Sequence, residues 1–258
     1  NPLQAGNMSS EGEAGSRQRI TLSDFVSQNR IDCLMFFARM ILIVCSVMYF
    51  LPIFISSADA YYKILLANGA INFLRLSQRC PQFQLSRDFM ATVFLEDSFH
   101  YLLYSFLFLT HPRVLTLVIL SPLFYSALHA AKFYMLASEK TQTPVLMGQF
   151  ISSFIESYSF QMLRMIAGTE ILLILVCILS LLSEFGVPGI LLIYLYSHFL
   201  KLRYMSRRNP YTRGMFSLFR FNLEQLVNHQ YCPIAIRKLI TGMISYISRQ
   251  APLVPQSS

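Results

Sequence analysis

The chain has 258 residues, of which 54% are hydrophobic and only 13% are charged, whereas soluble domains usually carry ~25% charged residues. This composition excludes an ordinary water-soluble globular protein. The net charge of +8 sits at one end: residues 201–258 hold nine Lys and Arg against one acidic residue, while residues 1–200 hold twelve of each sign. The sequence therefore predicts a neutral, apolar body followed by a basic tail.

The first twenty residues are rich in Gly, Ser, Glu and Gln and contain almost nothing that a fold would bury. This predicts a disordered N-terminus over 1–20. No cleavable signal peptide is apparent, because the first apolar run begins only near Leu34. Thr21 and Asp24 have the spacing of a helix-capping box, so a short helix is expected to begin there.

Leu34–Ile55 is the clearest membrane-spanning segment. Its 22 residues contain a single charge, Arg39, and at 1.5 Å per residue they cover the ~30 Å hydrocarbon core of a bilayer. Arg39 lies about one turn from the start of the segment, where a long side chain reaches the lipid headgroups. We therefore expect one helix to cross the membrane here.

Two pairs of apolar segments predict helical hairpins with short tips. Phe89–Leu109 and Val114–Leu136 flank Pro112, which removes a backbone donor and steers the preceding residue out of helix. Ile166–Phe185 and Ile190–Leu202 flank a short Gly-Val-Pro-Gly run in the same way. Each pair is expected to form two antiparallel limbs.

The segment Tyr61–Ser77 decides the number of spans, because it has only 17 residues and carries Lys63 and Arg75. If it crosses, the chain has six spans, both termini share one side, and 18 Lys and Arg residues lie on that side. The positive-inside rule favours this asymmetry with the basic side in the cytosol. We therefore predict an all-α, polytopic membrane helical bundle with about six spans over 21–205.

Three further segments predict amphipathic helices on the membrane surface or on protein, because their apolar residues recur at helical spacing. The first runs from Met147 to Met162, between the hairpins. The other two form a basic amphipathic cytosolic tail over 206–258 and are separated by Pro233. Their apolar stripes are Phe216, Phe219, Leu223, Leu226 and Val227, and then Ile236, Leu239, Ile240, Met243 and Ile247.

Cations follow directly after the last predicted span. They fit attraction to an anionic cytosolic leaflet, at ~1 kcal/mol for each Lys or Arg before salt screening. A purely topogenic role is the plainer alternative. Nucleic-acid binding is a poorer interpretation, because the interleaved Phe residues belong to an amphipathic stripe beside a membrane anchor. The predicted membrane-surface cations are Lys201, Arg203, Arg207, Arg208, Arg213, Arg220, Arg237 and Lys238.

A cluster of ionisable residues marks the start of the first hairpin. Glu96 and His100 lie four residues apart and share a helix face, with Asp97 beside them and Glu170 as a candidate to fold onto them. Ionisable groups at membrane depth are costly and often functional. We interpret the cluster as a structural polar network near the cytosolic interface. A proton, ion or lipid-headgroup site and a catalytic or metal site are the alternatives.

The sequence predicts no cofactor and no enzyme activity. Its five cysteines are scattered without a paired spacing, which argues against a disulfide framework or a zinc site. No HExxH, GxSxG, Walker or GxGxxG pattern occurs.

Several runs of residues resemble those of the transmembrane protein 33 family, also called the Krüppel-homologue-2 family. The resemblance extends from about residue 30 to residue 255. The runs are Leu66-Ala67-Asn68, Leu74-Arg75-Leu76, Phe83-Gln84-Leu85-Ser86-Arg87, Leu95-Glu96-Asp97-Ser98, His100-Tyr101-Leu102-Leu103-Tyr104-Ser105, Leu202-Arg203-Tyr204, Ser206-Arg207-Arg208-Asn209-Pro210-Tyr211 and Ile247-Ser248-Arg249.

This resemblance implies a membrane protein of the endoplasmic reticulum and nuclear envelope without an established enzyme activity. Relatives are associated with reticulons and tubular reticulum, with stress-response signalling and, in fungi, with nuclear pore assembly. The resemblance also implies a C-terminal amphipathic segment that binds curved membrane, which falls here on residues 211–250. Family members are often described with three spans, which differs from the six predicted above.

Residues and resemblance together predict a non-enzymatic protein that organises or shapes membrane of the endoplasmic reticulum and nuclear envelope, with both termini cytosolic. Its expected partners are the lipid bilayer, anionic lipids and other membrane proteins of the reticulum, and self-association stays open. One alternative is a transporter, channel regulator or lipid-handling protein that uses Glu96, Asp97, His100 and Glu170 in an inner cavity. An intramembrane enzyme at the same cluster is another.

Overall fold

The computed structural model describes residues 21–80, 86–143, 148–183, 186–206, 210–229 and 232–249. The predicted disordered N-terminus, 1–20, lies outside these ranges. Every regular element within them is an α-helix, so the all-α prediction is confirmed for this part of the chain. The helices are α1 (Leu22–Gln28), α2 (Arg30–Phe50), α3 (Ser57–Arg79), α4 (Arg87–Phe94), α5 (Asp97–Leu109), α6 (Thr116–Thr141), α7 (Gly148–Ser183), α8 (Val187–Met205), α9 (Pro210–Asn228) and α10 (Ile234–Arg249).

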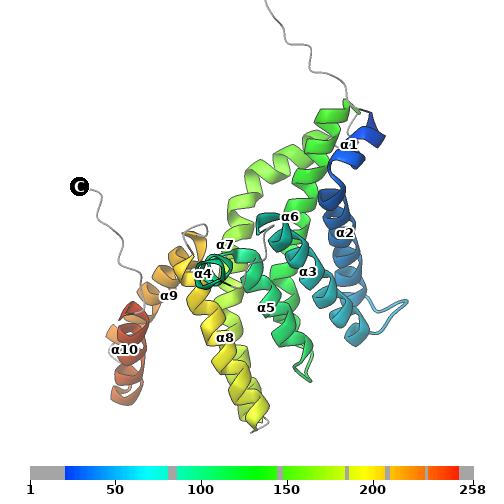
Figure 1. The fold of residues 1–258 in the computed structure, drawn as a ribbon. Coiled ribbons are helices and arrows are strands. Elements are labelled where there is room, and N and C mark those ends of the chain that lie inside the picture. Colours follow the sequence, from blue (N-terminus) through cyan, green and yellow to red (C-terminus); the bar gives the residue numbers. More distant parts are fainter. Residues whose placement is uncertain are drawn as a thin grey trace, which may run out of the picture.

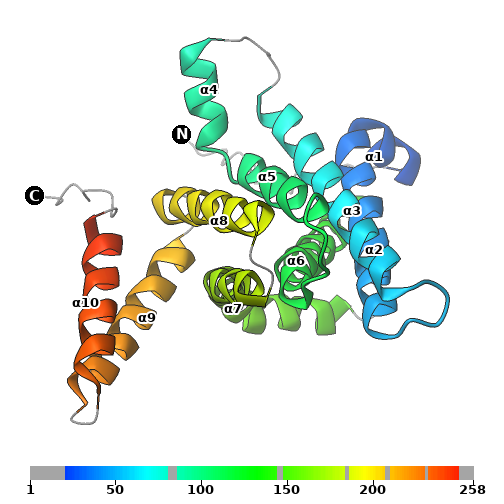
Figure 2. The same ribbon diagram turned by 90° about the horizontal axis from the view of Figure 1, so that it is seen from below.

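Six of these helices form the body of the molecule and lie in two rows. Helices α2, α6 and α7 pack side by side in one row, and α3, α5 and α8 pack side by side in the other. Figure 2 shows the two rows end-on. The C-terminal ends of α2, α5 and α7 and the N-terminal ends of α3, α6 and α8 all lie at one end of the molecule, the lower end in Figure 1.

The three helices of the first row are long and apolar enough to cross a membrane, by length and composition. They are the candidate spans in the described part of the chain, so six spans are not confirmed. In the second row, α5 has only 13 residues, or about 20 Å at 1.5 Å per residue, against a hydrocarbon core of ~30 Å. Long apolar helices are thus each joined to a shorter or more polar neighbour.

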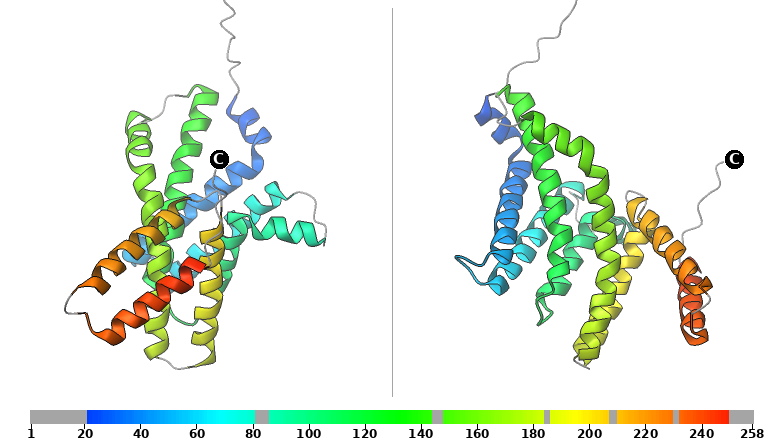
Figure 3. Two further views of the ribbon diagram at one scale, coloured as in Figure 1. Left: turned by 90° about the vertical axis from the view of Figure 1, so that its left-hand side faces the viewer. Right: turned by 180° about the vertical axis from the view of Figure 1, so that it is seen from behind.

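Two of the predicted boundaries are wrong. Phe89–Leu109 was expected to be one helix, but α4 ends at Phe94 and α5 begins at Asp97, with Glu96 in an extended conformation between them. The surface helix expected over Met147–Met162 and the span expected over Ile166–Phe185 are joined within the single helix α7. Figure 3 shows that α7 bends along its length instead of ending.

The expected first hairpin also differs in its packing. Its limbs share a short tip, but α5 packs mainly against α3 and α8, while α6 packs mainly against α7 and α2. The limbs therefore belong to different rows. The capping box at Thr21 is confirmed, because the Thr21 side chain accepts a hydrogen bond from the Asp24 backbone amide at 3.2 Å.

Aromatic side chains fill the space between the rows. Tyr104 is buried, and its ring centroid lies 4.9 Å from that of Phe108 and 5.3 Å from that of Phe199. Its hydroxyl donates a hydrogen bond of 2.7 Å to the carbonyl oxygen of Val118. That carbonyl lies four residues before Pro122, which has no N–H to complete the helical bond. Tyr104 thus satisfies an acceptor that the proline leaves open.

Candidate functional site

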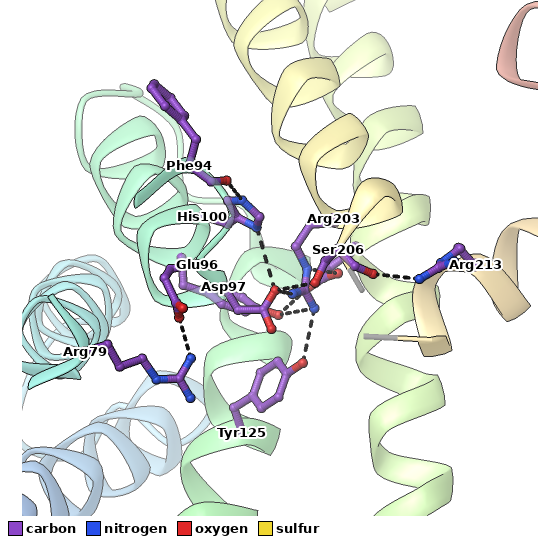
Figure 4. Close-up of polar contacts among 11 residues, drawn as sticks. Arg79, Phe94, Glu96, Asp97, His100, Tyr125, Arg203, Ser206 and Arg213 are labelled. Atoms are coloured by element: carbon purple, nitrogen blue, oxygen red, sulfur yellow. Dashed lines mark hydrogen bonds and ion pairs between the residues drawn. The ribbon is translucent and has the colours of Figure 1, made fainter. Parts of the chain in front are cut away.

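The candidate site is a buried polar network centred on Arg203, near the C-terminal end of α8 (Figure 4). The Arg203 guanidinium places Nε 3.2 Å from Oε2 of Glu170 on α7 and Nη1 3.1 Å from Oδ1 of Asp97 on α5. Its Nη2 donates to the hydroxyls of Tyr101 and Tyr125 at 3.3 and 3.2 Å. One side chain thereby connects four helices.

The partners of Arg203 are tied to each other as well. The Tyr101 hydroxyl donates to Oε1 of Glu170, and the Arg203 guanidinium lies over the Tyr101 ring at 4.9 Å from its centroid. Both Arg203 and Glu170 are fully buried. A buried ion pair is stable only when its remaining donors and acceptors are also satisfied, and this network supplies such partners on each side.

Two further contacts extend the network toward the tail. The Ser206 hydroxyl donates to Oδ1 of Asp97 at 2.9 Å, and Nη2 of Arg213 donates to the carbonyl oxygen of Ser206 at 3.0 Å. Arg213 belongs to α9, so the polar network is continuous from α5 through the end of α8 to the amphipathic tail.

Glu96 and His100, expected to act together, turn to different partners. Glu96 accepts a charged hydrogen bond from Nη1 of Arg79 on α3 at 2.5 Å. His100 donates from Nε2 to the carbonyl oxygen of Phe94 at 2.7 Å, while its Nδ1 stays 3.8 Å from Oδ1 of Asp97. These contacts hold α4, α5 and the end of α3 together around the break at Glu96.

The structure therefore joins Asp97 and Glu170 through Arg203 and leaves Glu96 on a separate ion pair. No group of three or more His, Cys, Asp or Glu side chains in the described ranges is arranged to hold a metal ion. Each of the predicted carboxylates is engaged by an arginine. These ion pairs tie the helices of the bundle to one another.

Arg203 was predicted to be a membrane-surface cation. This prediction is wrong, because the Arg203 side chain is buried inside the protein. Tyr101, Tyr125 and Ser206 are members of the network that the sequence did not single out. A cation directly after an apolar segment looks the same in sequence whether it faces lipid or protein. Only its acidic partners, distant in the chain, distinguish the two.

The tail forms a pair of helices beside α8, with α10 outermost (Figures 1 and 2). Helix α9 packs on α7, and α10 packs on α9. Phe216 and Phe219 of α9, predicted to contact lipid, instead pack against the hydrophobic core of the bundle. Val227 on the same stripe is buried, and Leu223 is half-buried. The α9 stripe is therefore largely a protein contact.

Helix α10 keeps an exposed apolar stripe. The stripe recurs at helical spacing and consists of Ile236 (46% exposed), Leu239 (65%), Met243 (47%) and Tyr246 (67%). Ile240, the residue after Leu239, is half-buried. A contiguous apolar face of this kind marks a contact with membrane or protein. We name these four residues the α10 stripe.

The remaining predicted surface residues have varied positions. Lys201, Arg237 and Lys238 are exposed, and so is Leu226 at 55%. Arg220 is also exposed, and its Nε lies 2.7 Å from Oε1 of Glu224. Arg207 and Arg208 lie outside the described residues.

Comparisons with known proteins identify the family. The model of the family described as Transmembrane protein 33/Nucleoporin POM33 matches residues 14–253. The chain is 38% identical to human Transmembrane protein 33 over 236 residues, covering 90% of this chain and 94% of the relative. It is 39% identical to Drosophila melanogaster Krueppel homolog 2 over 225 residues, covering 87% and 80%.

A Caenorhabditis elegans relative, Transmembrane protein 33 homolog, is 35% identical over 237 residues, covering 91% of this chain and 86% of that protein. No solved structure matches the chain. The family match covers the whole bundle and both tail helices. The chain belongs to the Transmembrane protein 33/Nucleoporin POM33 family of membrane proteins.

Proposed function

We propose that this protein is a non-enzymatic organiser of endoplasmic-reticulum and nuclear-envelope membrane. In this role it shapes the bilayer and binds other membrane proteins, with both termini in the cytosol. The family is named in part for a nucleoporin, which supports a location at the nuclear envelope. Charge supports the orientation: the hairpin tips are poor in cations, while most Lys and Arg residues belong to the opposite side.

The observation that carries this proposal is the α10 stripe on the outermost helix of the tail. Arg237 and Lys238 are exposed on the same helix, outside the stripe. A helix with an apolar face and cationic flanks binds at the boundary between headgroups and acyl chains. Helix α9 follows the end of α8 and packs on the middle of α7. We infer that α10 binds the leaflet on the side where α8 ends, so that it adds volume to one leaflet only, and this asymmetry favours curvature.

The polar network is a reason to propose neither an enzymatic nor a transport role for Glu96, Asp97 and Glu170. Asp97 and Glu170 are both bound by Arg203, and Glu96 is bound by Arg79. An acid–base or ion-coupling carboxylate must change its protonation or its partner during each cycle. These three carboxylates are positioned for tight association between helices, which suits a scaffold better than the transporter alternative.

The test is reconstitution of the full chain into vesicles, followed by electron microscopy of vesicle shape. We expect the wild-type protein to convert round vesicles into tubules or smaller, more curved vesicles. The variant Leu239→Asp/Met243→Asp should lose this activity because it places two charges on the α10 stripe. The control is Thr241→Asp/Ser245→Asp, which adds the same charge to exposed positions of α10 outside the stripe. Equal loss in both variants would refute the role of the stripe.

A further inference from the structure

A cavity of about 230 Å³ lies within the bundle, beside the Arg203 network. Its walls come from α2, α3, α5 and α6, with single residues from α7 and α9. A cavity needs only ~10–15 Å³ to hold one water molecule, so this space accommodates a small polyatomic group. It is smaller than the ~300–1,000 Å³ usual for drug-sized ligands.

Cations dominate the charge of the cavity wall. Arg39, Arg75, Arg79 and Lys132 line it, and Asp97 is its one acidic lining residue. Asp97 is already held by Arg203, and Arg79 by Glu96. The charge left without a counterion at the wall is therefore positive and comes from Arg39, Arg75 and Lys132.

Arg39 is the deepest of these cations, with only 6% of the residue exposed. Among the described residues it has neither a hydrogen bond nor an ion pair with a carboxylate. Asp32, the acidic residue that attracts it, forms no ion pair with Arg39 and instead accepts a hydrogen bond from Gln78 at 3.4 Å. Its other charged neighbour is Arg75, which repels it. The expectation that Arg39 reaches out to the headgroups is therefore wrong.

Arg75 is similarly placed on the facing helix. Its Nη1 lies 3.5 Å from Nε2 of His129, and His129 in turn stacks on the Tyr125 ring at a centroid distance of 6.0 Å. This contact supplies no negative charge. Two guanidinium groups that line one cavity without an ion pair to a carboxylate are costly unless an anion joins them.

Cationic side chains line the cavity from the protein surface to its interior. Lys132 and Arg79 are exposed, Arg75 is half-buried and Arg39 is buried, so positive side chains continue from the surface inward. Planar guanidinium groups match phosphate oxygens in paired hydrogen bonds. We propose that this cavity binds a phosphate group, carried either by an anionic lipid headgroup or by a small soluble phosphate compound. This inference is independent of the α10 stripe.

The experiment uses the full chain purified in detergent and measures binding by titration calorimetry with two probes. One is inositol 1,4-bisphosphate, a soluble headgroup; the other is phosphatidylinositol 4-phosphate in mixed micelles, with phosphatidylcholine micelles as the blank. If both probes bind and each displaces the other, the phosphate-bearing headgroup is sufficient for binding. Binding of the lipid alone identifies a membrane-borne ligand. Binding of neither probe overturns the proposal.

Variants locate the binding in the cavity. Arg39→Gln/Arg75→Gln should weaken binding by at least about tenfold, because it removes both guanidinium groups that would donate charged hydrogen bonds to the phosphate. Arg237→Gln/Lys238→Gln removes the same charge from α10, and its affinity should stay within about twofold of wild type. Equal weakening by the two variants would show general charge attraction and would contradict the cavity site.

A second variant keeps the test informative if the cavity variant does not fold. Lys132 is exposed at the cavity entrance, so Lys132→Gln leaves the buried side chains in place. We expect this variant to weaken binding by roughly threefold, because solvent and salt partly screen the charge of an exposed lysine. In addition, Arg39→Gln should raise the unfolding temperature of the unliganded protein, because it relieves the repulsion between Arg39 and Arg75. The same variant should show a smaller rise in unfolding temperature when the ligand is added. An unchanged ligand-induced increase in Arg39→Gln would contradict the proposal.

Discussion

Arg203 Nε lies 3.2 Å from Oε2 of Glu170, with both side chains buried between α7 and α8. The same guanidinium contacts Asp97, Tyr101 and Tyr125 on the neighbouring helices. Because α8 is followed directly by the tail, this contact fixes where the tail leaves the bundle. The position of α9 and α10 therefore depends on a pair of residues that lies far from the α10 stripe.

Replacing Arg203 with Met should destabilise the protein strongly. The change leaves Glu170 charged and without its cation in a buried site, and breaking such a pair costs about 3–5 kcal/mol. Thermal unfolding of the detergent-solubilised protein measures the loss. Arg220→Met is the matched control, because its pair with Glu224 is exposed and exposed pairs contribute about 0–1 kcal/mol. A similar unfolding temperature for both variants would contradict the structural role of Arg203.

Tyr104→Phe should cost about 1–3 kcal/mol of stability, because it leaves the Val118 carbonyl oxygen buried and without a donor. The double variant Tyr104→Phe/Pro122→Ala tests the cause. Alanine at 122 restores a backbone N–H that bonds to that same carbonyl, so the double variant should be more stable than Tyr104→Phe alone. Strictly additive losses in the unfolding temperatures would show that Pro122 and Tyr104 are unconnected.

Gly168→Leu should loosen the tail from the bundle. A Cβ at Gly168 of α7 lies 3.2 Å from Cε of Met215 on α9, so a larger side chain pushes against that contact. Overpacking costs about 1–3 kcal/mol, and amide hydrogen exchange of α9 should accelerate by about tenfold. Gly242→Leu on α10 is the control, because no atom lies within 4 Å of its added Cβ. Unaltered exchange in Gly168→Leu would place the attachment of α9 elsewhere.

Glycosylation mapping tests the proposed orientation. An acceptor carried on a Gly/Ser insert between α2 and α3, or between α5 and α6, should be glycosylated in microsomes, because the hairpin tips are proposed to face the lumen. The same insert after Gln142, between α6 and α7, should remain unmodified. The reverse pattern would place α9 and α10 in the lumen and remove the proposed contact with the cytosolic leaflet.

The sequence predicted helical elements well where hydropathy and caps decide them. Leu34–Ile55 corresponds to α2 at Arg30–Phe50, and both tail helices appear on either side of Pro233. It failed at the break between α4 and α5, because no proline or glycine marks Leu95 and Glu96. Tertiary contacts decide that break: Glu96 pairs with Arg79, and His100 bonds to the Phe94 carbonyl.

Long-range pairing was the main feature that the sequence did not reveal. Arg203 and Asp97 are 106 residues apart and meet only because α5 and α8 share a row. The cavity was missed for the same reason, since Arg39 and Arg75 come from two different helices. A signal was present in Arg39 alone, because a charge within an apolar span favours a partner or a pathway inside the protein.

The most direct test of the proposed membrane role measures the depth of α10 in a bilayer. A fluorescent nitrobenzoxadiazole label is attached at Leu239→Cys in the full chain, with native cysteines replaced, and the protein is reconstituted with spin-labelled lipids. The label at 239 should be strongly quenched and blue-shifted, whereas a label at Thr241→Cys, outside the stripe, should keep the emission of a water-exposed dye. Water-like emission without quenching at 239 would contradict the contact between the α10 stripe and lipid.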